Sequence, residues 1–238
     1  MKKTLVSMVA ALGLFSGSAL ADFLGLYVGT GMWNHAPSGN FNSTNSSSII
    51  DLDSSLAMSS DNEAYLYAAF EHPIPLVPNI RMESTALTHD GTASGVTFNG
   101  VGGLTGASTI SLDSIDTVLY WRILDNWVNV DLGLAMRKYD GDFTVGTQTR
   151  TISESVPLAY AAVQFDLPFT GLSVGGDYNY VSLSGNRIND IRIRLLYEMG
   201  IIGFEGGIRN YSVKLDDADG VNVDMSFDGV FLGVFLHF

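Results

Sequence analysis

The chain has 238 residues with 25 acidic and 12 basic side chains, and its formal net charge of −13 argues against nucleic-acid binding, which requires a basic face. It contains no cysteine, so disulfide bonds do not support its fold. Hydrophobic residues make up 46% of the chain, charged residues 16%, and glycine occurs 26 times, which suits a membrane barrel with a lipid-facing surface better than a soluble secreted protein.

The first 21 residues have the three parts of a secretory signal peptide. Two lysines precede an apolar run from Leu5 to Phe15, and the small residues that follow end in the A-x-A site Ala19-Leu20-Ala21. We therefore expect cleavage after Ala21, which leaves one barrel domain, Asp22–Phe238. Its formal charge is −15, because ten basic residues remain against 25 acidic ones. No later stretch approaches the roughly 18 apolar residues of a membrane helix.

After residue 21 the chain alternates apolar and polar residues over short stretches. The stretch from Trp127 to Tyr139 is the clearest, with large apolar side chains at even positions and small or polar ones at odd positions. Such a period of two places one set toward lipid and the other toward the lumen of a membrane β-barrel. The sequence predicts ten strands, at Phe23–Trp33, Asn62–His72, Asn79–Thr88, Thr109–Ile123, Trp127–Tyr139, Val156–Asp166, Leu172–Leu183, Asp190–Met199, Phe204–Leu215 and Val221–Phe238.

The connections between these strands are sorted by length. Those after even-numbered strands are short, whereas those after odd-numbered strands are polar loops, such as His35–Asp61, Asp140–Gln148 and Asp90–Ser108, the last with room for a hairpin beyond the membrane. Bacterial membrane barrels have this asymmetry and an even number of strands. We predict an all-β fold, an antiparallel up-and-down barrel of ten strands, closed because lipid tolerates no free sheet edge. Eight membrane strands with two short ones outside the membrane are the alternative.

The last nine residues are predicted to form one membrane strand. Its alternate positions are all apolar: Val230, Leu232, Val234, Leu236 and Phe238. The length matches a membrane β-strand of about 9–11 residues. Asp224, Ser226 and Asp228 share the same parity, so either they project above the bilayer or a bulge near Gly229 shifts the register. Other aromatic residues near strand ends, where membrane girdles belong, are Trp33, Trp121, Trp127, Tyr139, Phe165, Phe169 and Tyr178.

On these features the chain resembles the small outer-membrane β-barrel proteins of Gram-negative bacteria. Within that class it looks like a poorly characterised family with glycine pairs such as Gly175-Gly176 and Gly206-Gly207. The resemblance implies a monomeric barrel in the outer membrane, in contact with lipid and lipopolysaccharide. It also implies that Val230–Phe238 is the signal read by the barrel-assembly machinery. It brings no catalytic motif and no cofactor.

By parity, a set of charged side chains faces the lumen, where eight carboxylates nearly balance six arginines. They are Glu71, Glu83, Asp116, Asp131, Asp177, Asp190, Glu198, Glu205, Arg81, Arg122, Arg137, Arg192, Arg194 and Arg209. An arginine can bridge two carboxylates with its planar guanidinium, and side chains fill the interior of barrels of about eight strands. We expect a structural ion-pair network in the lumen. A narrow polar channel whose selectivity these charges set, or a site for a small ligand, are the alternatives.

The predicted loops are acidic. Asp216, Asp217 and Asp219 have the close spacing of oxygen ligands that calcium favours, which makes them candidate metal ligands. The segment lacks the full twelve-residue calcium loop and its terminal Glu, so a solvated turn is the alternative. Acidic loops could also share the divalent cations that bridge lipopolysaccharide.

No residue set forms a convincing catalytic site, so we expect that the protein is not an enzyme. His89-Asp90 is the only pair comparable to the rim Asp and His of ten-stranded outer-membrane proteases, but neighbours in a strand face opposite ways. His35 could approach this pair only through a mobile loop. The predicted function is a structural protein or a minor pore for small solutes. Binding of an outer partner through the acidic loops is the alternative, and a hydrolase at His89 is the third hypothesis.

Overall fold

The computed structural model describes residues 24–74 and 76–238, which form strands and turns. The strands are β1 (Gly25–Ser43), β2 (Ile50–Asp51), β3 (Asp61–Glu71), β4 (Asn79–Thr85), β5 (Thr88–Phe98), β6 (Val101–Ser111), β7 (Asp113–Asp125), β8 (Val128–Val145), β9 (Gln148–Ile152), β10 (Ser155–Leu167), β11 (Leu172–Leu183), β12 (Asn186–Met199), β13 (Ile202–Ala218) and β14 (Val221–His237). Within the described ranges, no helix has the length and apolar character needed to cross a membrane. The predicted signal peptide, residues 1–21, lies outside the described residues.

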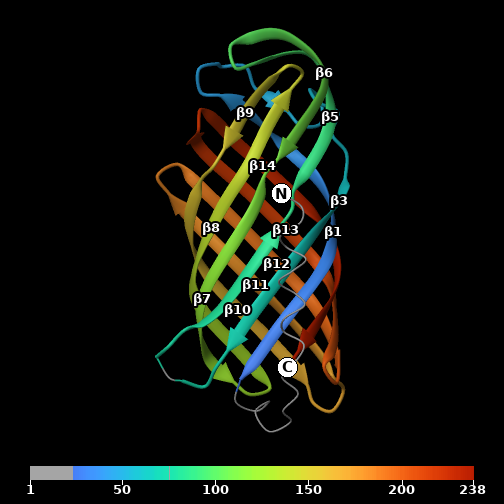
Figure 1. The fold of residues 1–238 in the computed structure, drawn as a ribbon, viewed down its shortest axis with the longest axis vertical. Coiled ribbons are helices and arrows are strands. Elements are labelled where there is room, and N and C mark those ends of the chain that lie inside the picture. The colour runs from blue at the N-terminus through green and yellow to red at the C-terminus, as the bar shows by residue number, and fades with distance from the viewer. Residues whose placement is uncertain (1–23, 75) are drawn as a thin grey trace, which may run out of the picture.

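Ten strands close into an antiparallel barrel (Figure 1). Their order around the wall is β1-β3-β4-β7-β8-β10-β11-β12-β13-β14, and β14 pairs with β1 to close the ring. Phe238 completes this seam, because its N–H donates to the carbonyl of Leu26 (2.9 Å) and its own carbonyl accepts from the N–H of Leu26 (3.0 Å). The prediction of a closed ten-stranded barrel is confirmed, and the eight-strand alternative is wrong.

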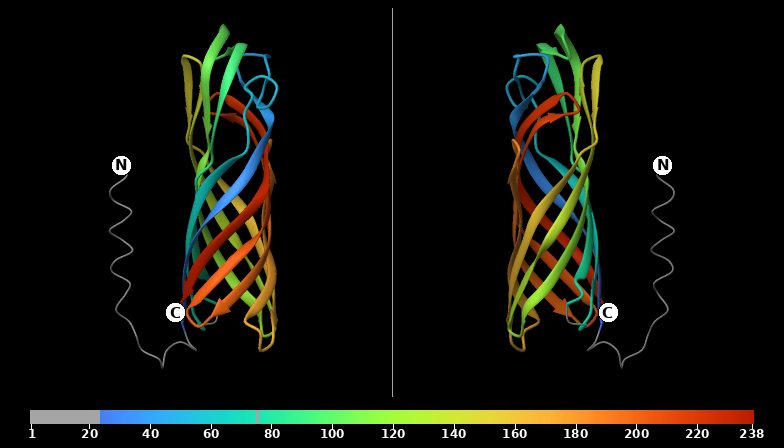
Figure 2. Two further views of the ribbon diagram at one scale, coloured as in Figure 1. Left: turned by 90° about the vertical axis from the view of Figure 1, so that its right-hand side faces the viewer. Right: turned by 90° about the vertical axis from the view of Figure 1, so that its left-hand side faces the viewer.

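The two ends of the barrel differ (Figure 2). At the end that carries Phe238, short turns join β3 to β4, β7 to β8, β10 to β11 and β12 to β13. We call this the turn end. At the other end, the β5–β6 hairpin and β9 continue the wall beyond the ring, and both β6 and β9 pair with the upper part of β8. The connections from β4 to β7 and from β8 to β10 are therefore built largely from strands.

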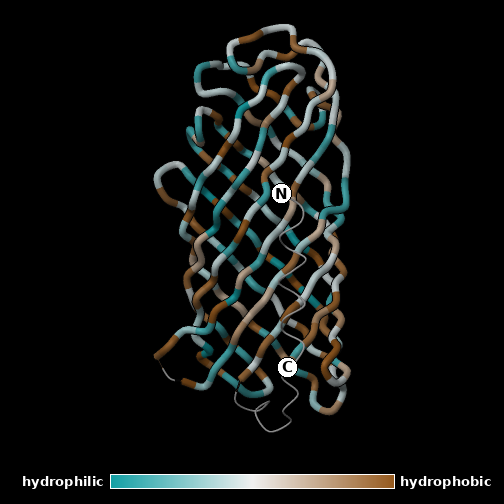
Figure 3. The backbone as a smooth tube through the Cα atoms, in the orientation of Figure 1, coloured by the Kyte–Doolittle hydropathy of each residue, from teal (hydrophilic) through white to brown (hydrophobic). Residues whose placement is uncertain are grey.

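The outward face of the wall changes from apolar to polar at one level. On β13 the change falls between Ile208, which is 55% exposed, and Asn210. On β14 it falls between Val230, which is 56% exposed, and Asp228. Ile208 pairs with Val230 and Asn210 pairs with Asp228, so the level continues from strand to strand. Between this level and the turn end, half-exposed apolar side chains form the belt that a bilayer requires; Figure 3 shows how hydropathy alternates along the strands.

Beyond the belt, the wall with β2, the β5–β6 hairpin and β9 forms a part that we call the extension. It has an apolar core, in which Phe41 packs edge to face against Phe98 and Phe143 with ring centroids 5.5 and 5.0 Å apart. Further buried members are Ile50, Leu52, Leu56, Ile110, Val145, Ile152, Val223 and Met225. The prediction of exposed loops at His35–Asp61 and Asp140–Gln148 is therefore wrong. The outward residues of these segments are polar, which gave the segments the composition of loops although their inward residues are apolar.

Two aromatic side chains predicted for the membrane girdles lie inside the barrel instead. Trp33 is 1% exposed and Tyr139 is completely buried. Both have the parity of inward-facing neighbours, Gly31 for Trp33 and Arg137 for Tyr139, so proximity to a strand end was the wrong criterion.

The polar residues on the outward face of β14 lie above the belt. β14 pairs with β1 from Val221 to His237 without a register shift, so no bulge occurs near Gly229. Asp224 and Asp228 are exposed, and the Ser226 hydroxyl lies 3.0 Å from the hydroxyl of Ser212 on β13. Of the two possibilities left open by the sequence, projection above the bilayer is the one observed.

A charge placed within the belt should destabilise the barrel. Val234 lies near the middle of the belt and is 46% exposed. We expect Val234→Arg to lower the free energy of unfolding by about 2–4 kcal/mol, because the arginine must lie at hydrocarbon depth. Ala36→Arg, on the outward face of β1 opposite Asp228, is the matched control and should change it by less than about 0.5 kcal/mol. Urea unfolding from lipid vesicles measures both; equal effects would contradict the position of the belt.

Candidate functional site

A layer of buried ions crosses the lumen at the level where the belt ends. We call it the central layer; its members are Arg81, Arg137, Arg192, Arg209, Glu83, Asp116, Asp177 and Asp190, each 8% exposed or less. They project inward from strands whose alternate residues form the lipid-facing belt. Four arginines against four carboxylates leave no net charge, which reduces the cost of holding ions away from water.

The central layer joins opposite walls of the barrel. β4 and β12 stand five places apart in the ring of ten strands, so they face each other across the lumen. The guanidinium of Arg192 on β12 donates to both oxygens of Glu83 on β4, at 2.7 and 2.9 Å, and to Asp177 at 3.1 Å. Arg81 donates to Glu83 at 2.7 Å. Paired side chains therefore span the full width of the lumen at this level.

A second chain of ion pairs runs beside this bridge. Arg137 donates to the two oxygens of Asp116 at 2.7 and 2.6 Å and to Asp190 at 2.7 Å. Arg209 donates to both oxygens of Asp190 at 2.9 and 2.7 Å. The guanidinium carbon of Arg209 also lies 4.6 Å from the ring centroid of Trp33. This indole, which was predicted to lie in the membrane girdle, thus covers one side of the layer.

Between the central layer and the turn end lies a cavity of about 540 Å³, which we call the lower chamber. Arg122 lies in its wall and donates to Glu71 at 2.5 Å and to Asp131 at 3.1 Å. The Glu198 carboxylate lies 2.6 Å from Nδ1 of His237 at the open end of the chamber. The lower chamber meets the central layer at Arg81, which lines the chamber as well.

Arg194 and Glu205, two further members of the predicted lumen set, form a long ion pair. Nη1 of Arg194 lies 3.8 Å from Glu205 and 3.9 Å from Asp177, and its Nε is buried without a partner among the described residues. Glu205 accepts a hydrogen bond of 2.8 Å from the hydroxyl of Tyr65 on β3, a strand three places away in the ring. Arg194 is therefore the least completely paired arginine of the lumen set.

A histidine pair lies between the central layer and the apolar core of the extension. Nε2 of His89 and Nδ1 of His35 are 3.0 Å apart, and each residue is 1% exposed. The prediction that His35 could reach His89 only through a mobile loop is wrong, because β1 continues through His35 and pairs there with β14 and β3. Asp90 points outward, so His89 and Asp90 form no dyad at the rim.

The histidine pair lies above the belt, outside the membrane-spanning part of the wall. Burial and the neighbouring His89 lower the pKa of His35 to about 3. Burial also lowers the pKa of His89. Both imidazoles are therefore uncharged near neutral pH, as an apolar setting beside the positive Arg209 requires.

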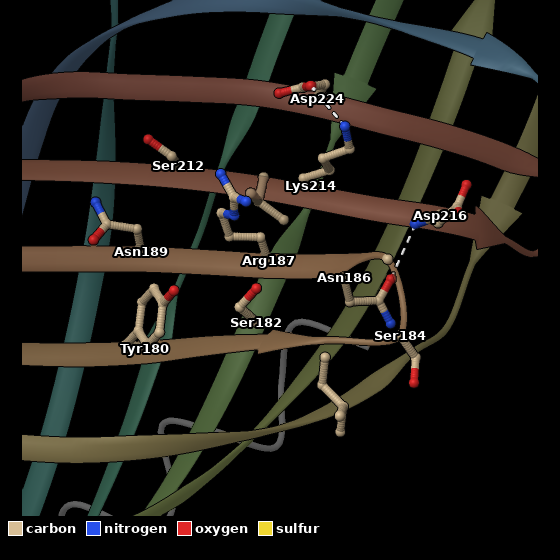
Figure 4. A pocket seen from close by; sticks show the side chains of 13 residues that line it. Tyr180, Ser182, Ser184, Asn186, Arg187, Asn189, Ser212, Lys214, Asp216 and Asp224 are labelled. Carbon is tan, nitrogen blue, oxygen red and sulfur yellow. Dashed lines mark hydrogen bonds and ion pairs between the residues drawn. The ribbon is translucent and has the colours of Figure 1, made fainter.

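A depression on the outside of β11, β12 and β13 lies above the belt (Figure 4). Arg187 and Lys214 are directly opposed across β12 and β13 within it. Lys214 lies 3.5 Å from Asp224, and both side chains are more than half exposed (54% and 63%). An exposed pair of this kind stabilises little, so the depression is a solvated polar surface.

Of the three aspartates proposed as metal ligands, Asp216 and Asp217 lie at the end of β13, beside this depression, and Asp219 lies in the turn that follows. The backbone N–H of Asp216 donates to the side chain of Asn186 at 3.0 Å, and a carboxylate oxygen of Asp219 accepts from the backbone N–H of Ser153 at 2.8 Å. Asp217 donates its backbone N–H to Asn222 at 2.9 Å. Over residues 24–74 and 76–238, no group of three or more carboxylates or histidines is arranged to hold a metal ion.

Comparison with solved structures identifies the fold. The outer membrane protease OmpT from Escherichia coli matches with a TM-score of 0.54 and 9% identity, over 92% of this chain and 97% of OmpT. The translocator domain of the autotransporter NalP from Neisseria meningitidis (0.44, 9%, over 90% and 88%) and Ail of Yersinia pestis (0.35, 12%, over 89% and 99%) are also similar. The chain has the Gram-negative outer-membrane β-barrel fold. Neither a protein-family model nor a curated protein sequence matches it.

Removing one partner of the central layer should be costly. We expect Arg192→Met to reduce the free energy of unfolding by about 3–5 kcal/mol, because Glu83 loses two hydrogen bonds and Asp177 loses one while both carboxylates stay buried. Arg187→Met on the same strand is the matched control, since Arg187 is exposed, and its effect should stay within about 0.5 kcal/mol. Urea unfolding compares the two variants; similar values would mean that the layer does not support the barrel.

Stability should fall in mild acid because of the histidine pair. In the unfolded chain each histidine takes up a proton near pH 6.5, whereas in the folded protein the pKa of His35 is about 3. The unfolded state therefore binds more protons between these values, and stability falls as pH drops from about 6.5 toward 3, by about 1 kcal/mol per pH unit for His35. Unfolding between pH 7 and 5 measures the slope. The double variant His35→Phe, His89→Leu should flatten it, and an unchanged slope would rule out the pair as its source.

Proposed function

We propose that this protein is a sealed barrel of the outer membrane that acts through its outer surface rather than as a route for solutes. The observation that carries the proposal is the bridge from Arg192 to Glu83 across the lumen, at 2.7 and 2.9 Å. Above that bridge, the apolar core of the extension fills the interior a second time. A hydrated ion would have to cross both zones.

The extension supports a role at the outer surface. Its buried aromatic core makes it a structured part of the barrel, so its outward side chains are held in place. Exposed aspartates dominate that surface: Asp53, Asp61, Asp90, Asp113, Asp140, Asp142, Asp216, Asp217, Asp219, Asp224 and Asp228. An acidic, rigid surface of this kind favours basic partners, or shared divalent cations at the lipopolysaccharide surface.

The other two hypotheses have less support. A minor pore would require the central layer to open, although its ions are bonded at 2.6–3.1 Å on both sides. A rim hydrolase at His89 would require an accessible imidazole, whereas His89 is 1% exposed and its Nε2 lies 3.0 Å from Nδ1 of His35. OmpT is a protease, and His89 offers no counterpart for that activity in this chain.

Conductance tests the seal. The refolded full-length barrel, inserted into a planar lipid bilayer, should give no discrete current steps at neutral pH, while a porin in the same bilayer gives them. The reason is that both interior zones exclude water from the axis of the barrel. Discrete steps from the unmodified protein would overturn the sealed-barrel proposal in favour of a minor pore.

A further inference from the structure

We infer that the lower chamber is a binding site for a small organic cation, an alkylammonium ion that enters from the turn end. The inference rests on the sealed lumen proposed above, because a chamber closed at one end can hold a ligand without passing it on. The volume of about 540 Å³ lies within the range of roughly 300–1,000 Å³ typical of small-molecule sites.

The charge of the chamber selects a cation. The central layer above it is neutral, with four arginines and four carboxylates. Below that layer the lumen contains two arginines, Arg122 and Arg194. Four carboxylates line the chamber with them: Glu71, Asp131, Asp166 and Glu198. Arg81 also lines it, but its charge is balanced within the central layer, where it donates to Glu83. Negative charge is therefore in excess around the chamber, and it lies within protein walls where charges act more strongly than in water.

Carboxylate oxygens remain free to bind such a ligand. Arg122 contacts Oδ1 of Asp131 and Oε1 of Glu71, and His237 contacts Oε1 of Glu198. The second oxygen of each carboxylate forms no hydrogen bond with any residue that the structure describes. All three residues line the chamber, so their free oxygens can accept from an ammonium group.

Aromatic side chains favour an organic cation over a hydrated metal ion. The chamber is lined by Tyr27, Tyr67, Tyr120, Tyr160 and Phe235. Where the chamber meets the central layer, the guanidinium carbon of Arg81 lies 4.3 Å from the ring centroid of Tyr67. A cation–π contact is therefore already present in the wall of the chamber. Aromatic walls with nearby carboxylates match an alkylammonium ion, whose methyl or methylene groups contact the rings. Among the described residues no cluster is suited to a metal ion.

Arg194 is the feature that would favour the opposite charge. Its contacts with Glu205 and Asp177 are long, at 3.8 and 3.9 Å, so an anion could compete for it. Glu205 and Asp177 would repel that anion, and their negative charges partly offset the positive charge of Arg194. The inference therefore predicts preference for a cation over an anion of equal size, which can be measured.

Calorimetric titration of the refolded full-length barrel in detergent micelles tests the site. Tetramethylammonium is the probe, acetate is the anionic comparison and tert-butanol is the uncharged one. Tetramethylammonium should bind, with acetate and tert-butanol at least tenfold weaker. Absence of tetramethylammonium binding, or equal binding of acetate, would overturn the inference.

Variants locate the binding. Asp131→Asn with Glu198→Gln removes two charges and leaves Arg122 paired with Glu71, and we expect at least tenfold weaker binding. Asp224→Asn with Asp228→Asn removes the same charge from the outer face of β14 and should leave binding unchanged. Gln164→Glu adds a carboxylate to the chamber wall and should strengthen binding severalfold, which keeps the test valid if the first variant misfolds. Equal affinities across the set would place the probe elsewhere and overturn the inference.

Two failures can be told apart. A bilayer that stays silent together with a protein that binds no tetramethylammonium overturns the chamber and leaves the seal intact. Discrete conductance of the unmodified protein overturns the seal and, with it, the inference of a binding chamber that is closed at one end.

Discussion

The bridge between Glu83 and Arg192 is the interaction on which the interior depends. It exists only because the ring has ten members, which places β4 opposite β12. A carboxylate alone at this level would be a buried charge without compensation, and so would a guanidinium. Glu83 also pairs with Arg81 on its own strand, and Arg192 pairs with Asp177 on the neighbouring strand. Closure of the wall joins these two local pairs, because β4 and β12 face each other only in the closed ring.

The interior of the barrel then separates into three zones that differ in the polarity of their side chains. Next to the turn end, the lower chamber is polar and keeps unpaired acceptors. The central layer replaces water by fixed ion pairs. The extension above it is packed with hydrocarbon and aromatic rings, as in the interior of a soluble β protein. The histidine pair lies where the second zone meets the third, and its low pKa reflects that position.

The period of two in the sequence was enough to predict the strands, the barrel and the side chains that face inward. The alternation in β8 and the apolar face of Val230–Phe238 were enough for a closed ten-stranded barrel, and parity alone selected side chains that the structure has in the lumen. It could not reveal that Glu83 and Arg192 meet, because these residues are 109 positions apart in the sequence and their contact depends on the order of strands in the ring. It also missed Phe41 and Phe143 as core residues, since serine, asparagine and glycine around them have the composition of loops. Trp33 was misplaced because nearness to a strand end outweighed its parity.

The reversal of polarity along β13 has a consequence for how the molecule sits in its membrane. Toward the turn end, Ile208 faces outward and Arg209 inward; farther along, Asn210 faces outward and Tyr211 inward. The polarity of both faces changes between one outward residue and the next. Raising the barrel in the membrane would expose apolar side chains to water, and lowering it would bury amides and carboxylates in hydrocarbon. The barrel thus has a single depth of insertion in the bilayer. The acidic extension is therefore presented to any approaching molecule at a fixed height above the lipid surface.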